Sequence, residues 1–244
     1  SHHRRLWLLL FHHGYQLIMT DAALSPFKAL AGIAGALWLT GCANGEISPL
    51  GVAAQALLPG REDDALQARA EQLPFASIML KSEDLEGLVV LGAVSGDSTF
   101  WPAGNRMSLA LYQDGLQATA GMPRDLLSLH YTAAEAHGGA LEPYPWRWPA
   151  PPTYRVESRW QARDGTLFAA EARGELRCGE AAPTRLPLGS LPLQTCHETL
   201  YWSTGEVSHS TLWRDPESLR LWAAELTPWP QGPTIGWQGA RPWG

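Results

Sequence analysis

The chain has 244 residues, with 18 Lys and Arg against 24 Asp and Glu and a formal net charge of −6 at pH 7. Three of the basic residues and one acidic residue precede Cys42, so the part of the chain after Cys42 contains 15 basic and 23 acidic residues. This acidity argues against binding of nucleic acid or an anionic lipid surface through bulk charge. About 200 residues follow Cys42, enough for one domain with its own core.

Residues 1–18 do not fit the pattern of the segment that follows them. They contain Arg4-Arg5 and a short apolar run, Leu6–Phe11, and they precede Met19, the first Met of the chain. We interpret them as an upstream extension of the reading frame, with Met19 as the start. A long, positively charged beginning of a signal peptide is the alternative that the sequence leaves open.

An apolar run followed by a cysteine predicts a lipoprotein signal peptide over residues 19–41. Ala29–Leu39 is uncharged; its length matches the apolar core of a signal peptide but falls short of the ~20 residues that span a bilayer. Leu39-Thr40-Gly41-Cys42 resembles a bacterial lipobox, in which a peptidase cuts before a cysteine that carries diacylglycerol. Cys42 is therefore the expected lipid attachment site, and residues 42–49 the lipidated tether. The alternative is a buried helix with a chance cysteine.

Residues 50–244 are expected to form a single mainly β periplasmic domain that begins with short helices. The helices are predicted at 50–58 and 62–72, separated by Pro59-Gly60. The second has acidic residues in its first turn, where the helix dipole favours them.

Downstream, short apolar or alternating runs bounded by turn residues predict antiparallel strands. The predicted strands are 75–80, 87–92, 107–112, 116–120, 154–163, 166–177, 195–202, 206–213 and 219–227. Hairpin turns are predicted at Asp114-Gly115, Asp164-Gly165 and Ser203-Thr204-Gly205. The proline-rich segment Pro143–Pro152 is expected to cross between the two halves in an extended form. The predicted fold class is mainly β, an antiparallel sandwich or open barrel built from hairpins.

Two cysteines, Cys178 and Cys196, remain once Cys42 is lipidated. An exported chain lives where disulfides persist, so we expect these two to be bonded, which would stabilise the fold by roughly 3 kcal/mol. Two buried thiols on separate strands are the alternative, because sequence does not give the distance between the Cα atoms. His197 adjoins Cys196, but no further Cys or His follows at ligand spacing, so no metal or cofactor is expected.

Sequence patterns of catalysis are missing from the chain. It contains no nucleophile elbow, zinc-protease motif, phosphate-binding loop or dinucleotide fingerprint. Four glutamates in predicted strands could supply a glycosidase pair, but alternating carboxylates on a strand usually form its solvated face. They are Glu157, Glu171, Glu175 and Glu198. The histidines after Cys42 are scattered, at positions 130, 137, 197 and 209. We therefore assign no catalytic residue and expect no enzyme.

Tryptophan is unusually frequent. Those after Cys42 are Trp101, Trp146, Trp148, Trp160, Trp202, Trp213, Trp222, Trp229, Trp237 and Trp243. For the ones within strands we expect mainly core positions. Trp146, Arg147 and Trp148 lie in the proline-stiffened segment, where exposed rings would offer a rigid platform for a glycan or a partner protein.

Several short motifs together resemble a known lipoprotein family. They are the lipobox, Gln72–Ile78, Leu88–Gly92, Trp101, Thr119, Gly121-Met122, Tyr201-Trp202, Thr204–Val207 and Ser210. On these motifs the chain resembles the YjbF family, the group 4 capsule polysaccharide lipoproteins of GfcB type, over essentially all of the mature chain. It departs at Asp114-Gly115, where relatives tend to have Gly-Arg, and it has Ser203 at the polar position after the Tyr-Trp pair.

The resemblance implies an outer-membrane lipoprotein that serves exopolysaccharide or capsule production or export without catalytic residues. Its implied partners are the membrane, through the lipid, together with polysaccharide and an outer-membrane β-barrel protein of the same system. Ala43 fits a location at the periplasmic face of the outer membrane, because an acidic residue after the cysteine retains lipoproteins in the inner membrane of well-studied bacteria. The alternatives are a carbohydrate-active enzyme and a purely structural scaffold that binds a partner protein.

Overall fold

A computed structural model describes residues 63–83, 85–104, 106–135 and 138–243. Every described residue belongs to one compact unit of the chain, 47–244. The predicted extension, the signal peptide, the tether with Cys42 and the helix at 50–58 therefore lie outside the described residues. Among the residues that are described, no helix has the length and apolarity needed to cross a membrane.

The second predicted helix is present as α2 (Asp63–Gln72), and the rest of the described chain is almost entirely strand and turn. The strands are β1 (Ser77–Lys81), β2 (Glu86–Val90), β3 (Ala93–Ser95), β4 (Ser98–Pro102), β5 (Ser108–Tyr112), β6 (Gly115–Ala120), β7 (Arg124–Ala133), β8 (Tyr154–Ala162), β9 (Leu167–Leu186), β10 (Gly189–Trp202), β11 (Val207–Arg214), β12 (Leu221–Leu226) and β13 (Ile235–Arg241). The expectation of a mainly β fold is confirmed.

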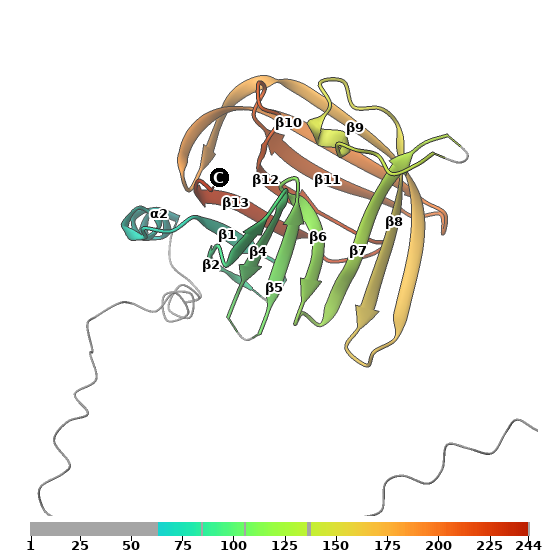
Figure 1. The fold of residues 1–244 in the computed structure, drawn as a ribbon, viewed down its shortest axis with the longest axis horizontal. Helices are drawn as coiled ribbons and strands as arrows, with labels where there is room; N and C mark the ends of the chain where they lie inside the picture. Colours follow the sequence, from blue (N-terminus) through green and yellow to red (C-terminus); the bar gives the residue numbers. More distant parts are fainter. Residues whose placement is uncertain (1–62, 84, 105, 136–137, 244) are drawn as a thin grey trace, which may run out of the picture. The chain divides into compact units, whose positions relative to one another are not determined.

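The strands form two antiparallel sheets. The larger has nine strands in the order β2-β1-β13-β12-β11-β10-β9-β8-β7, and it is strongly curled (Figure 1). The smaller has the order β3-β4-β5-β6. One hydrophobic core joins them, because Trp101 and Leu109 of the small sheet belong to the same buried cluster as Tyr154 and Trp237 of the large one. Buried residues alternate with more exposed ones along β8 and β11, whereas β1 and β2 are buried over most of their length.

The turn from β6 into β7 links the two sheets. The Asp125 carboxylate accepts hydrogen bonds from the backbone N–H groups of Gly121 (3.0 Å) and Met122 (2.9 Å). The Thr119 hydroxyl donates to the same carboxylate and accepts from the Leu126 N–H (2.9 Å). These bonds satisfy the backbone groups where regular pairing stops. Thr119, Gly121 and Met122, which belong to the motifs that carry the sequence resemblance, thus take part in this turn together with Asp125.

Strands β9 and β10 continue well beyond their predicted limits. A register shift between Gln194 and Cys196 marks a bulge, which bends a strand pair. Cys178 and Cys196 are paired across the two strands at this bulge and are joined by a disulfide. Beyond it, Leu186 and Leu193 form a separate buried cluster with Ala223. The extension of the two strands, residues 179–194, was not predicted from sequence because Gly, Pro and polar residues interrupt its apolar pattern.

Four further strands were missed by the sequence prediction: β3, β4, β7 and β13. β3, β4 and β13 lack a clean alternation of apolar and polar residues, whereas residues 127–133 of β7 do alternate and were overlooked. β3 is only three residues long and exposed, and β7 is interrupted by a register shift between Leu126 and Ser128. β13 has Gly236 and Gly239 within it. Pairing with neighbours, which a single sequence does not display, stabilises these strands.

Candidate functional site

The proline-rich segment closes one end of the core instead of offering an exposed platform. A turn of 3-10 helix, Pro145–Arg147, replaces the extended conformation predicted there and turns Trp146 inward. Trp146 is only 1% exposed and meets the rings of Tyr131 and Tyr144 edge-on. The prediction that Trp146 contacts a glycan or a partner protein at the surface is therefore wrong, because its ring lies in the core. We call residues 141–149 the plug segment.

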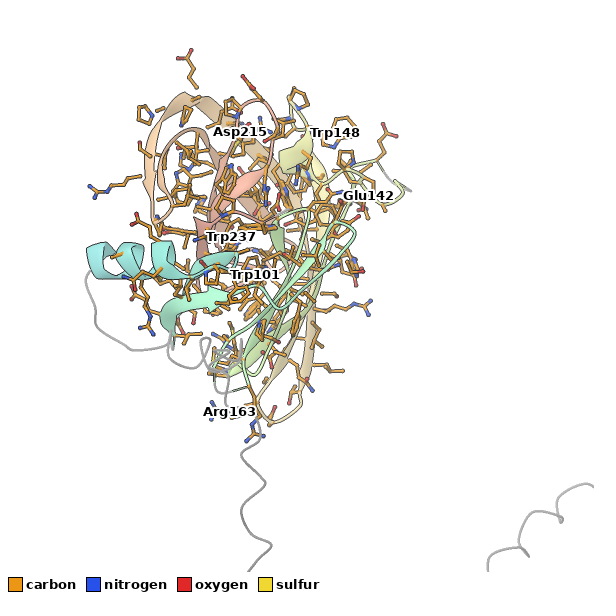
Figure 2. The ribbon with its side chains drawn as sticks, turned by 60° about the vertical axis from the view of Figure 1, so that its left-hand side comes forward. Trp101, Glu142, Trp148, Arg163, Asp215 and Trp237 are labelled. Carbon is orange, nitrogen blue, oxygen red and sulfur yellow. A yellow bond between two sulfur atoms is a disulfide. The ribbon has the colours of Figure 1, made fainter. Side chains whose placement is uncertain are left out.

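The other two residues of the predicted platform are partly accessible. Trp148 is half-buried, and its indole Nε1 donates to the Pro143 carbonyl (2.7 Å) within the plug segment. The Arg147 side chain is 26% exposed. Figure 2 shows Trp148 and Glu142 at one end of the domain and Arg163, in the β8–β9 turn, at the other.

The plug segment is fastened to the turn between β5 and β6. The indole Nε1 of Trp146 donates to the Gln113 carbonyl (2.7 Å), and the Tyr144 N–H donates to the Gln113 side-chain oxygen (2.8 Å). Gln113 and Asp114 both have positive φ, 48° and 65°, so they form the two-residue turn that was predicted at Asp114-Gly115. Gly115 instead lies in β6, where a Cβ would come within 2.1 Å of the Trp146 ring. A glycine is therefore needed at position 115 so that the Trp146 ring can pack against the backbone of β6.

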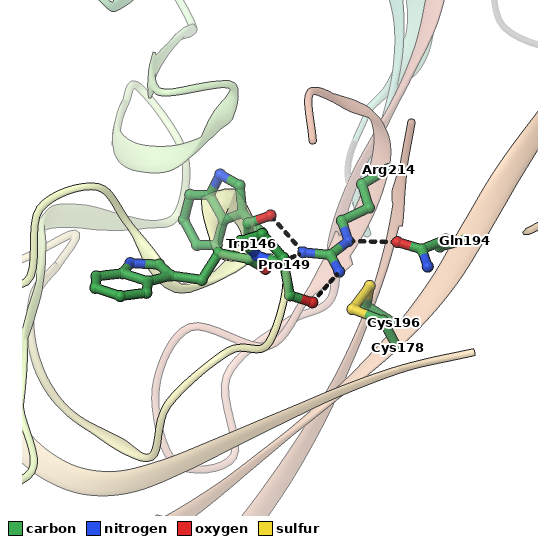
Figure 3. The surroundings of a disulfide bond; sticks show 7 residues. Trp146, Pro149, Cys178, Gln194, Cys196 and Arg214 are labelled. Atoms are coloured by element: carbon green, nitrogen blue, oxygen red, sulfur yellow. Dashed lines mark hydrogen bonds between the residues drawn. A yellow bond between two sulfur atoms is a disulfide. The ribbon is translucent and has the colours of Figure 1, made fainter. Parts of the chain in front are cut away.

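Arg214, at the end of β11, holds the plug segment from the other side (Figure 3). Its side chain is 1% exposed, and burial lowers the pKa of its guanidinium below the ordinary value. The guanidinium donates to the carbonyls of Trp146 (2.8 Å), Trp148 (2.7 Å) and Pro149 (3.2 Å). Its Nε donates to the Gln194 side chain (2.9 Å). A buried cation is thus balanced by carbonyl dipoles.

Beside the plug segment, Asp114 lies between two further arginines, and we call Asp114, Arg147 and Arg220 the arginine–aspartate cluster. Arg147 donates to one carboxylate oxygen of Asp114, and the Nε of Arg220 is 3.9 Å from the other. Burial raises the pKa of Asp114, although both guanidinium groups act in the opposite direction. The guanidinium of Arg220 lies over the rings of Trp222 (4.7 Å) and Trp243 (4.5 Å). This cluster was not anticipated, because its members are far apart in the sequence.

The four strand glutamates do not gather into one site. Glu157 and Glu171 are cross-strand neighbours on the outer face of the large sheet, and Glu175 on the same face pairs with Arg173 and Arg177. Glu198 points the other way. It is 3% exposed, accepts a hydrogen bond from the Tyr154 hydroxyl (2.6 Å), and burial raises its pKa. The expectation of a solvated face is therefore wrong for Glu198, because its position in β10 faces the core.

The described histidines lie on three strands of the outer face, where His197 and His209 are diagonal neighbours on paired strands and His130 lies on another strand. His130 is in β7, His197 in β10 and His209 in β11, and all are exposed. His137 lies outside the described residues. Within the described ranges, no three His, Cys, Asp or Glu side chains come together as a metal site would require.

An aromatic stack at the opposite end of the domain was also missed. The ring of Trp160 stacks between those of Phe168 and Trp229, at centroid distances of 5.5 and 5.6 Å. Arg124 lies over the Trp229 ring at 5.8 Å. Phe168 is 44% exposed, whereas Trp229 is fully buried. The signal available in the sequence was the pairing of Trp160 and Phe168 around the predicted Asp164-Gly165 hairpin.

Comparison with known proteins supplies a likeness of fold. No family model matches the chain, and no curated protein matches it. Among solved structures, the chain is similar to the hypothetical lipoprotein YmcC from Escherichia coli K12, with a TM-score of 0.58 and 13% sequence identity. The two chains share a fold. The match covers 75% of this chain and 89% of YmcC, so it extends far beyond one hairpin motif.

Proposed function

We propose that this protein is an outer-membrane lipoprotein that acts without catalysis in the production or export of a surface polysaccharide, binding glycan or a secretion partner. The observation that carries the proposal is the fold shared with a chain described as a lipoprotein, together with the lipobox at Leu39–Cys42. The fold alone does not indicate a biochemical function, and the lipobox alone indicates only where the protein is located. Their agreement makes a lipid-tethered β domain the best-supported arrangement, and two acyl chains suffice for stable anchoring.

Membership of the YjbF family is part of this proposal. The structural roles of the motif residues support it, because they stabilise turns and core contacts of the shared fold. Trp202 donates to the Ser208 hydroxyl (2.8 Å), and the Ser210 hydroxyl accepts from the Thr227 N–H (3.2 Å). Gly205, with φ of 96°, lies in the turn between β10 and β11. The link with capsule or exopolysaccharide comes from this resemblance.

A binding role is favoured over hydrolysis by the positions of the carboxylates. A glycosidase needs two carboxyl groups that flank one sugar bond at a fixed separation. Glu198 is enclosed in the core beside Tyr154, whereas Glu157 and Glu171 are on the outer face of the sheet. This arrangement supports the proposal of a non-enzymatic protein, with a carbohydrate-active enzyme as the weaker candidate.

The proposal is tested by deleting the gene and measuring surface polysaccharide. We expect a reduced or altered amount that the wild-type gene restores, and unchanged polysaccharide would contradict the proposed function. Separation of inner and outer membranes from cells labelled with palmitate tests the location independently. Tryptophan fluorescence in the presence of the cell's own polysaccharide then separates a glycan-binding protein, whose emission changes, from a scaffold for a partner, whose emission stays constant.

A further inference from the structure

The arginine–aspartate cluster carries more positive than negative charge. Two guanidinium groups, from Arg147 and Arg220, share the single carboxylate of Asp114. The nearby carboxylate of Glu142 does not pair with them: its oxygens accept from Tyr112 (3.2 Å) and Gln113 (3.0 Å). Asp97 also acts electrostatically on Asp114, so the excess of positive charge is confined to the two guanidinium groups and the one carboxylate that they share. Paired guanidinium groups of this kind attract an ion of opposite sign.

The two arginines are also held in place. Arg220 lies over the rings of Trp222 and Trp243 and donates from Nη2 to the Trp243 carbonyl (2.6 Å). Arg147 is fixed by Asp114. Rigid guanidinium groups lose little conformational entropy when they bind a ligand, which favours recognition.

Hydrogen-bonding capacity remains unused at the cluster. A guanidinium group has five N–H donors. The Nε of Arg147 and the Nε of Arg220 are enclosed and find no acceptor in the part of the chain that the structure describes, so the Nη groups are the donors that a ligand would meet. Both side chains remain accessible, at 26% and 21% exposure. By contrast, Arg159, Arg173 and Arg177 on the outer face each pair with a glutamate.

We propose that the arginine–aspartate cluster binds one oxyanion group, a carboxylate or a phosphate, of an acidic glycan. Guanidinium groups match the geometry of both oxyanions and form charge-assisted hydrogen bonds with them. The half-buried rings of Trp148 and Trp222 offer apolar surface to an attached sugar. The choice of a glycan as the carrier rests on the proposed function, whereas binding of the oxyanion itself rests only on the cluster.

The test uses the full chain purified in a mild detergent and titrated calorimetrically with inorganic phosphate, trigalacturonate and uncharged maltotriose. We expect saturable binding of at least one anion and none of maltotriose. Trigalacturonate alone would identify a uronic acid as the carrier, and phosphate alone a phosphorylated glycan. Absence of saturable binding of either anion up to about 10 mM would overturn the proposal.

One variant that removes a positive charge and one that removes a negative charge distinguish an effect on anion binding from an effect on folding. Arg147→Gln should weaken anion binding about tenfold, and Asp114→Asn should tighten it severalfold, because it removes the competing carboxylate. Arg177→Gln, at an outer-face arginine that is 85% exposed, is the matched control and should leave binding unchanged. Equal weakening by all three variants would overturn the proposal. A negative result here leaves the polysaccharide phenotype of the deletion strain as a separate test of the proposed function.

Discussion

Arg214 offers the sharpest test of how the plug segment is held. The substitution Arg214→Met keeps a long unbranched side chain and removes the guanidinium. The carbonyls of Trp146, Trp148 and Pro149 then lose their donor, and so does the side chain of Gln194. The substitution leaves acceptors without partners at a site where Arg214 itself is 1% exposed.

The expected loss of stability follows from these bonds. A hydrogen bond from a charged donor contributes about 1.5–3 kcal/mol, and a buried carbonyl left unpaired costs about 1–3 kcal/mol. Two effects reduce the sum: water can reach the carbonyls of Trp148 and Pro149, which lie toward the surface, and the variant no longer buries a charge. We therefore expect a loss of about 3 kcal/mol in the free energy of unfolding, a large share of the 5–15 kcal/mol typical of a domain.

The assay is urea unfolding followed by tryptophan fluorescence, combined with limited proteolysis mapped to residues 141–152. We expect a lower urea midpoint and new cleavage in the plug segment. The matched control, Arg177→Met, changes an 85% exposed arginine paired with Glu175 and should unfold like the wild type. A loss below about 1 kcal/mol, or unchanged proteolysis, would refute the role assigned to Arg214.

Three further sets of substitutions test the core. Glu198→Gln should stabilise the protein relative to wild type increasingly as pH rises from 5 to 8. Burial raises the pKa of Glu198 in the folded protein. The contribution of this carboxyl to wild-type stability is therefore complete below its pKa in the unfolded chain and is lost as pH rises through its pKa in the folded protein. Equal differences in urea midpoint between variant and wild type at pH 5 and pH 8 would contradict this. Gly115→Ala should cost about 1–3 kcal/mol because the new Cβ overlaps the Trp146 ring, and adding Trp146→Leu should recover part of the loss in urea unfolding. Replacing Cys178 and Cys196 by Ser should cost roughly 3 kcal/mol, measured by urea unfolding with and without reductant, and a reductant effect that persists in the variant would exclude the disulfide as its source.

The hairpins were predictable from sequence because local chemistry encodes them. Asp164-Gly165 lies in the turn between β8 and β9, and Gly165 has φ of 88°. Alternating residues in β8 and β11 also gave the burial pattern that the strands show. By contrast, the two-residue turn lies at Gln113-Asp114, one residue earlier than predicted. The displacement arises because Gly115 is needed beside Trp146, a contact between distant segments.

Burial of particular side chains could not be predicted in the same way. Trp146 lies in a segment whose prolines suggest an exposed loop, yet contacts with Gln113 and Arg214 hold the segment over the core. Glu198 is different, because its neighbours on the same side of β10, Cys196, Leu200 and Trp202, already indicate the inner face, and only its charge suggested solvent. The arginine–aspartate cluster joins residues from three distant segments. Such features depend on tertiary contacts that outweigh local propensity.

The central claim, that a lipid-tethered domain serves a surface polysaccharide, is tested most directly in a strain lacking the gene. Surface polysaccharide is measured after complementation with the wild-type chain or with Cys42→Ala at matched protein levels. We predict that the wild-type chain restores the polysaccharide and that the Cys42→Ala chain, which has no site for the lipid, does not. Polysaccharide that is unchanged by the deletion and equal in both complemented strains would contradict the account.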